Sequence, residues 1–121
     1  EIKSIVINNG ITTIGDMAFA NLKNLTSVIL SDSITNIGYA AFFGCKNLKK
    51  LTLGSSLVEI GKWAFINSPI KELYIPDNVK KIGEFAFNCL EDDFSGNASI
   101  PSTCKLDKKA FSDKYSVNIR K

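Results

Sequence analysis

Ile37-Gly38-Tyr39-Ala40-Ala41-Phe42 is one copy of a short stretch that occurs five times along the chain, and this stretch decides the fold. The other copies are Ile14-Gly15-Asp16-Met17-Ala18-Phe19, Ile60-Gly61-Lys62-Trp63-Ala64-Phe65, Ile82-Gly83-Glu84-Phe85-Ala86-Phe87 and the degenerate Leu106-Asp107-Lys108-Lys109-Ala110-Phe111. Each copy ends in a phenylalanine, at positions 19, 42, 65, 87 and 111, so the steps between copies are 23, 23, 22 and 24 residues. A regular period in the twenties predicts a repeat solenoid in which each repeat forms one coil.

A second pattern, L-x-x-L-x-L with aliphatic residues at the marked places, precedes the first four copies. It spans residues 2–7, 25–30, 48–53 and 70–75. The last three positions alternate as the side chains of a strand do, so we expect short parallel strands on one wall. A polar turn follows each strand, and a second aliphatic pair then predicts a second, shorter strand on the opposite wall. These pairs are Ile11/Ile14, Ile34/Ile37, Leu57/Ile60 and Val79/Ile82.

The glycine of each copy is expected to turn the corner after the second strand. Asp107 replaces it in the fifth copy, and Asp is one of the few residue types that also visit the left-handed region. The following x-x-Ala-Phe segment is too short for a stable free helix, so we predict a single helical turn that packing holds in place. The expected fold class is therefore an α/β repeat solenoid. Equivalent residues of neighbouring coils should stack about 4.8 Å apart, with the phenylalanines forming one buried ladder.

Length and composition fit one folded domain. The chain has 121 residues, of which 45% are apolar and 22% are charged, as in folded rather than disordered proteins. We divide it into about five coils, residues 2–24, 25–47, 48–69, 70–93 and 94–121. The chain begins at Glu1 without a methionine, and we interpret it as a piece of a longer array.

Nothing in the sequence predicts catalysis. There is no histidine, which removes the usual base for a cysteine nucleophile and the usual zinc arrangements. The glycines recur at the repeat spacing and form no phosphate-binding loop, and basic residues do not interleave with aromatic ones as in nucleic-acid binding proteins. No apolar run approaches the roughly 18 residues of a membrane span. We expect no enzymatic activity, no cofactor, no metal, no nucleic-acid partner and no membrane span.

The three cysteines are expected to be buried free thiols. Cys45 and Cys89 lie two coils apart, or about 9–10 Å by the stacking distance, whereas a disulfide needs Cα atoms within about 7 Å. Cys104 falls on the Val79 position, on a different wall from Cys89. We interpret all three as small hydrophobic side chains of the core.

Three further features each have two interpretations. Residues 88–99 contain an insertion with the acidic run Glu91-Asp92-Asp93; a calcium site is conceivable, but the run lacks the intervening residues of calcium loops, and we favour a solvated bulge. The positive charge behind the net +3 is concentrated between Lys105 and Lys121, and we favour a solvated end over a weak polyanion contact. Asn24 and Asn97 begin N-glycosylation sequons, which matter only in a secreting eukaryote and otherwise arise by chance.

The strand pattern together with I-x-x-I-G-x-x-A-F-x-x-C resembles the BspA-like class of leucine-rich repeats. The resemblance covers nearly the whole chain, four copies well and the fifth loosely. Only Cys45 keeps the family's cysteine, because Leu22, Ser68 and Leu90 replace it elsewhere. The resemblance implies a right-handed solenoid from surface or secreted proteins of host-associated bacteria and some parasitic protists. Members are linked to adhesion to host matrix proteins and cells, but the family has no binding-residue motif to transfer.

The candidate protein-binding face consists of residues that point outward from the first strands. They are Val6, Ile29, Thr52 and Tyr74, with Ser4, Ser27, Lys50 and Glu72 beside them. One interpretation is that β-forming residues simply occupy strand positions; the other is an apolar strip with a polar margin that contacts a protein. A second strip, Met17, Ala40, Trp63 and Phe85, is expected to be partly buried against the helical turns.

The expected function is a non-catalytic protein-binding module of a cell-surface or secreted protein, in adhesion to host matrix proteins or cells. The alternative is a structural spacer whose parent binds elsewhere. The first coil should expose the edges of Ile2, Ile5, Ile7, Ile11, Ile14 and Phe19, since no polar cap precedes them. We therefore expect self-association through the N-terminal end, and a C-terminal end, with Lys108 and Lys109, that is closer to a cap.

Overall fold

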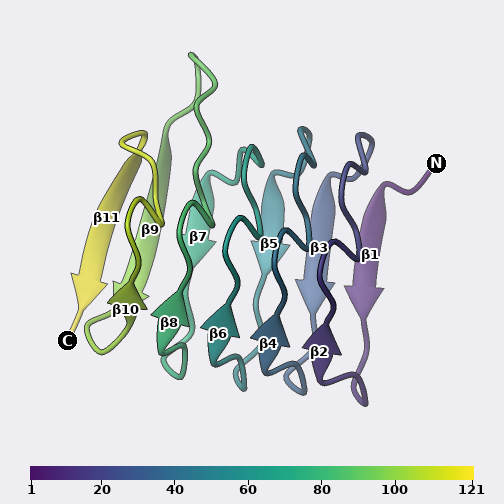
Figure 1. Ribbon diagram of the computed structural model, residues 1–121, viewed down its shortest axis with the longest axis horizontal. Coiled ribbons are helices and arrows are strands. Elements are labelled where there is room, and N and C mark those ends of the chain that lie inside the picture. Colours follow the sequence, from purple (N-terminus) through teal and green to yellow (C-terminus); the bar gives the residue numbers. More distant parts are fainter.

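Each coil of the computed structural model contributes one strand to each of two opposite walls, and the structure describes all residues 1–121 (Figure 1). The first wall contains β1 (Ser4–Ile7), β3 (Ser27–Leu30), β5 (Lys50–Thr52), β7 (Glu72–Tyr74), β9 (Gly96–Pro101) and β11 (Tyr115–Arg120). The second wall contains β2 (Thr13–Ile14), β4 (Asn36–Ile37), β6 (Glu59–Ile60), β8 (Lys81–Ile82) and β10 (Lys105–Leu106). All paired neighbours are parallel, which confirms the predicted solenoid. β11 adds a sixth layer beside β9.

The two walls differ in continuity. The second wall is one five-stranded sheet, whereas the first wall is divided into the sheets β1-β3-β5 and β7-β9-β11. The connection from Phe65 to Ile70 is one residue shorter than the one from Phe42 to Leu48, and it contains Pro69, which has no N–H to donate. Because this connection is shorter, β7 is displaced from the position in which it would pair with β5.

The third side of each coil, which we call the turn wall, comprises residues 15–21, 38–44, 61–67, 83–88 and 107–111. It contains no helix, so the predicted helical turn and the α/β class are wrong. Alternate N–H groups donate to the next coil, as from Met17 to the Tyr39 carbonyl and from Phe19 to the Ala41 carbonyl, both at 2.8 Å. The N–H groups between them close short i to i+3 turns. Because the donors are used between coils, no i to i−4 helix forms.

The corner glycines Gly38, Gly61 and Gly83 are required for close approach between coils rather than for their backbone angle, whereas no neighbouring atom crowds Gly15. Positive φ occurs two residues later, at Met17, Ala40, Trp63, Phe85 and Lys109. A Cβ atom on Gly61 would lie 2.7 Å from the carbonyl carbon of Gly38 in the preceding coil. The glycine was predicted at the right position, but the prediction that it adopts the left-handed backbone conformation is wrong.

The core is a continuous cluster of 27 buried residues between the walls. Its widest part is the predicted phenylalanine ladder, in which Phe42 stacks on Phe19 and Phe65 with ring centroids 5.3 and 5.0 Å apart. Phe87 continues the stack on Phe65 at 5.2 Å and carries Phe111 at 5.1 Å. The inner rings are fully buried, so the ladder prediction is confirmed.

Both ends of the solenoid expose apolar side chains. At the first coil Ile2 and Ile11 are exposed, but Ile14 is buried and Ile5, Ile7 and Phe19 are half-buried, so the predicted exposure is only partly correct. At the other end Leu106, Val117 and Ile119 are exposed. The expectation that the basic C-terminal end is closer to a cap is therefore wrong. Self-association through the N-terminal end stays a prediction.

Candidate functional site

The residues of the predicted binding face lie on the first wall in two outward rows of side chains. Val6, Ile29 and Thr52 lie in register across β1, β3 and β5, and Ser4, Ser27 and Lys50 form the row beside them. Val6 is 58% exposed and Ile29 is 48% exposed. Apolar side chains of this size are thus held side by side in water on a rigid sheet.

The face does not continue as one apolar strip. Glu72 and Tyr74 belong to the second sheet, and their neighbours are polar: Asn97 and Ser99 on β9, then Ser116 and Asn118 on β11. The predicted strip is therefore two half-faces, an apolar one on β1-β3-β5 and a polar one on β7-β9-β11. The four polar residues were missed because the leucine pattern degenerates after residue 87. The available signal was the alternation of polar and apolar residues in Asn97-Ala98-Ser99-Ile100 and in Ser116-Val117-Asn118-Ile119.

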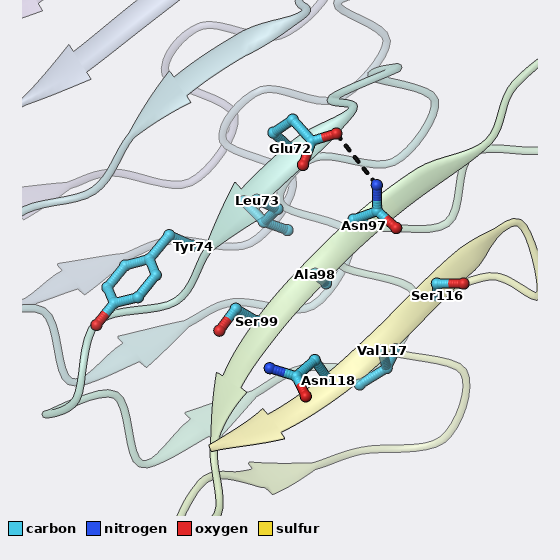
Figure 2. A pocket seen from close by; sticks show the side chains of 9 residues that line it. All are labelled: Glu72, Leu73, Tyr74, Asn97, Ala98, Ser99, Ser116, Val117 and Asn118. Carbon is cyan, nitrogen blue, oxygen red and sulfur yellow. Dashed lines mark hydrogen bonds between the residues drawn. The ribbon is translucent and has the colours of Figure 1, made fainter.

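The polar half-face holds a shallow hollow of about 380 Å³. Figure 2 shows its lining side chains on three adjacent strands: Glu72, Leu73, Tyr74, Asn97, Ala98, Ser99, Ser116, Val117 and Asn118. The Nδ2 of Asn97 donates to a carboxylate oxygen of Glu72 at 3.1 Å. The hollow thus offers hydroxyl and amide groups beside one exposed aromatic ring, which can contact a polar surface.

Arg120, the last residue of β11, fixes the edge of this half-face at the C-terminal ends of its strands. Its guanidinium carbon lies 4.1 Å from the ring centroid of Tyr74, which is the range of a cation–π contact. Its nitrogens donate to the Ser99 hydroxyl at 2.8 Å and to the Asp77 carboxylate at 2.9 Å. Tyr74 is nevertheless 57% exposed, so the ring is held in one position and still presents a free surface.

The second strip has a mixed outcome. Ala40 is buried, Trp63 and Phe85 are half-buried, and Met17 is exposed. The Trp63 ring packs against Tyr39 at 5.7 Å and Phe43 at 6.2 Å. Partial burial is confirmed for Trp63 and Phe85, although they pack on the turn wall and not on helical turns. This strip is mainly structural.

The cysteines are free, as predicted, but not all are buried. Cys45 and Cys89 are fully buried, whereas Cys104 is partly exposed. Desolvation by burial raises the pKa of all three thiols above the ordinary value of 9.0. This keeps them protonated and disfavours nucleophilic chemistry.

The remaining candidate features form no metal site. The acidic insertion projects beyond the neighbouring connections as a loop (Figure 1), and no three His, Cys, Asp or Glu side chains converge to hold a metal ion. Asn24 and Asn97 are both exposed, and Asn97 lies inside the polar half-face. The structure also contains no helix long and apolar enough to cross a membrane.

Comparison with known proteins places these features in context. The protein-family model for the BspA type leucine rich repeat region matches residues 1–118 of this chain, in six copies. A leucine rich cell surface protein from Faecalibacterium prausnitzii is 29% identical with a TM-score of 0.85, and the match covers 98% of this chain and 31% of that protein. A leucine-rich repeat protein from Eubacterium ventriosum is 25% identical with a TM-score of 0.78, over 97% of this chain and 32% of that protein. Among curated proteins, none matches the sequence significantly.

The lengths of these structural relatives matter for function. The chain spans about a third of each of the two proteins. A leucine-rich repeat protein from Bacteroides capillosus, with 25% identity and a TM-score of 0.60, is matched over 64% of its length. The activities of such whole proteins can therefore reside partly outside the region that corresponds to this chain.

Proposed function

Because the chain belongs to the BspA type leucine-rich repeat family, we propose that it is a non-catalytic protein-binding module that uses the outward face of the first wall. Leucine-rich repeat proteins of this type generally work without catalysis. The module would present its two half-faces to a protein partner, with the apolar half-face carrying most of the contact energy.

One observation carries this proposal, and it is the difference between the two walls. The outward residues of the second-wall strands are all polar: Thr13, Asn36, Glu59, Lys81 and Lys105. In the corresponding row of the first wall Val6, Ile29 and Tyr74 are apolar or aromatic and strongly exposed, whereas Thr52, Ser99 and Asn118 are polar. Strand propensity acts on both walls alike, so it does not explain why adjacent strands carry exposed apolar residues side by side only on the first wall. An exposed apolar row on one wall is typical of an interaction surface.

Adhesion at a cell surface is the setting that we propose for this binding. One structural relative is described as a cell surface protein, and stacked repeats present extended surfaces for binding. A partner on a host matrix or a host cell fits a flat, rigid face of this kind. The proposed location of the parent protein is accordingly the cell surface or the secreted fraction.

The alternative function is a structural spacer that only extends the array. The same observation disfavours it, since a spacer needs no exposed apolar row on either wall. The spacer interpretation predicts no affinity of this chain for matrix proteins.

The test is direct binding of the 121-residue chain to immobilised matrix prepared from cultured host cells, measured by surface plasmon resonance. The proposal expects saturable binding that a variant with Val6→Asp and Ile29→Asp loses. Absence of saturable binding to matrix and to intact host cells would support the spacer and refute the proposal. Circular dichroism of the variant checks that the fold is retained.

A further inference from the structure

The break in the first wall opens a groove between β5 and β7. The groove has a volume of about 460 Å³ and is lined by Lys49, Lys50, Leu51, Thr52, Lys71 and Glu72. In the preceding coils a row of backbone hydrogen bonds joins each coil to the next at this position. The Thr26 N–H donates to the Lys3 carbonyl at 2.8 Å, and the Lys49 N–H donates to the Thr26 carbonyl at 3.1 Å. The next bond of this series, from the Lys71 N–H to the Lys49 carbonyl, is not formed. The groove thus lies where the hydrogen bonds between the strands of the first wall are interrupted, and three lysines line it.

The side chains that line this β5/β7 groove carry a net positive charge. Three lysines and one glutamate line it, which gives a net charge of +2 (3 − 1). The Glu72 carboxylate accepts a hydrogen bond from Asn97 on β9. None of the three lysines takes part in an ion pair; the ion pairs of the chain are Lys62–Glu84, Lys81–Asp107 and Arg120–Asp77. The three ammonium groups are therefore free to pair with an anionic partner.

A second hollow adjoins the groove and sets a limit on the partner. It has a volume of about 450 Å³ and shares Lys49 and Lys71 with the groove. Lys46 also lines it, together with the acidic side chains of Glu91 and Asp93. A uniformly anionic polymer would meet these carboxylates as well as the lysines, and like charges in an interface are unfavourable. Separate acidic groups that reach only the lysines would avoid that repulsion.

The apolar half-face adjoins the same groove. Thr52 lines the groove and also stands in register beside Ile29, which in turn neighbours Val6. A ligand that fills the groove therefore lies next to a row of exposed apolar side chains. Protein segments can carry acidic and apolar side chains together, whereas a sulfated polysaccharide has no apolar side chains to bury on that row.

From this arrangement we propose that the β5/β7 groove binds the carboxylate side chains of an acidic segment in the protein partner, while apolar side chains of the same segment pack on Val6 and Ile29. The inference rests on the proposed function and specifies the chemistry of the partner. Carboxylate–ammonium pairing would orient the partner along the wall, and the apolar contact would hold it.

The experiment compares two triple variants that lose the same charge. The groove variant carries Lys49→Gln, Lys50→Gln and Lys71→Gln; the control carries Lys105→Gln, Lys108→Gln and Lys121→Gln, all exposed residues away from the groove. The probes are a short fluorescein-labelled peptide of alternating aspartate and leucine, the same peptide with asparagine for aspartate, and fluorescein-labelled heparin. Fluorescence anisotropy measures each affinity at low and at physiological salt, since exposed charge pairs weaken as salt rises.

We expect the aspartate–leucine peptide to bind the unmodified chain and to bind the groove variant about tenfold more weakly, while the control variant stays within about twofold. Equal affinities of the two variants, or no binding of this peptide by the unmodified chain, would overturn the inference. Lysine-dependent binding of heparin without binding of the peptide would overturn it in favour of a polysaccharide. If matrix binding depends on Val6 and Ile29 but not on the three lysines, the groove inference fails and the proposed function stands.

Discussion

The hydroxyl of Tyr115 donates a hydrogen bond of 2.6 Å to the carbonyl oxygen of Ile70, which lies two coils away. The ring of Tyr115 packs edge-on against Phe94 at 5.2 Å and Phe111 at 5.5 Å. At the other end of β11, Arg120 donates to the carbonyl oxygen of Ile75. Ile70 and Ile75 flank β7, so β11 is anchored to β7 at both ends across the intervening β9. These two contacts hold the polar half-face as one unit.

The first prediction concerns the Tyr115–Ile70 bond. Tyr115→Phe removes the donor and leaves a buried carbonyl oxygen without its partner, so we expect a loss of about 1–3 kcal/mol in the free energy of unfolding. Urea denaturation measures it. The matched control is Tyr39→Phe, whose side chain is exposed and which should change stability by less than about 0.5 kcal/mol. Equal stabilities of the two variants would show that the bond does not contribute.

The same residue gives the stability a pH dependence. Burial raises the pKa of Tyr115 above its ordinary value of 10.0, and it raises the pKa of the Cys45 and Cys89 thiols above 9.0. In the unfolded chain these groups lose their protons first, so above pH about 9 the unfolded state binds fewer protons than the folded state. Their contribution to stability is therefore complete below pH about 8 and is lost as pH rises. Urea titrations should show this decline, and it should be smaller above pH about 10 in Tyr115→Phe. Stability that rises between pH 8 and 11 would contradict the assignment.

The second prediction concerns the phenylalanine ladder. Phe42→Ala removes a fully buried ring that stacks on both sides, so we expect a loss of about 3–5 kcal/mol by chemical denaturation. Phe19→Ala, at the half-buried end of the ladder with one stacking partner, should cost about half as much. A loss below about 1 kcal/mol for Phe42→Ala would show that the ring is not in the core.

The third prediction separates close approach from backbone conformation at the corner glycines. A Cβ atom on Gly61 would be forced against the Gly38 backbone, whereas a Cβ atom on Gly15 would meet nothing within 4 Å. Gly61→Ala should therefore cost about 1–3 kcal/mol, and Gly15→Ala should be neutral or stabilise by up to about 1 kcal/mol. Thermal denaturation of both variants decides it. Similar losses for both would mean that glycine is needed for its φ angle instead.

The fourth prediction concerns the thiols. Only Cys104 is partly exposed, so a thiol reagent without denaturant should modify Cys104 alone, and all three cysteines only after unfolding. Mass spectrometry after a short labelling pulse identifies the modified residue. Rapid modification of Cys45 or Cys89 in the native protein would contradict their burial.

The sequence predicts the stacked parts of the fold well, because each depends on a repeated pattern. The phenylalanine period and the paired isoleucines determine which side chains stack, and the structure confirms both. The turn wall could not be predicted, since its left-handed positions hold Met17, Trp63 and Lys109, which are not residue types that favour positive φ. The loop at Pro69 is visibly shorter, yet its effect on the β5–β7 pairing depends on three-dimensional geometry. The residues of the candidate site were accordingly predicted on β1, β3, β5 and β7 and missed on β9 and β11.

The most direct test of the binding-face proposal compares one aspartate on each wall. Ile29→Asp places a charge on the apolar half-face, and Val58→Asp places the same charge beside β6, where the native side chain is 41% exposed and Ile29 is 48% exposed. Binding of both variants to immobilised host-cell matrix is measured by surface plasmon resonance, after denaturation has shown equal stability. We predict that Ile29→Asp weakens binding by about tenfold or more and that Val58→Asp leaves it unchanged. Unchanged binding by Ile29→Asp, or an equal loss in both variants, would contradict the assignment of the first wall as the binding face.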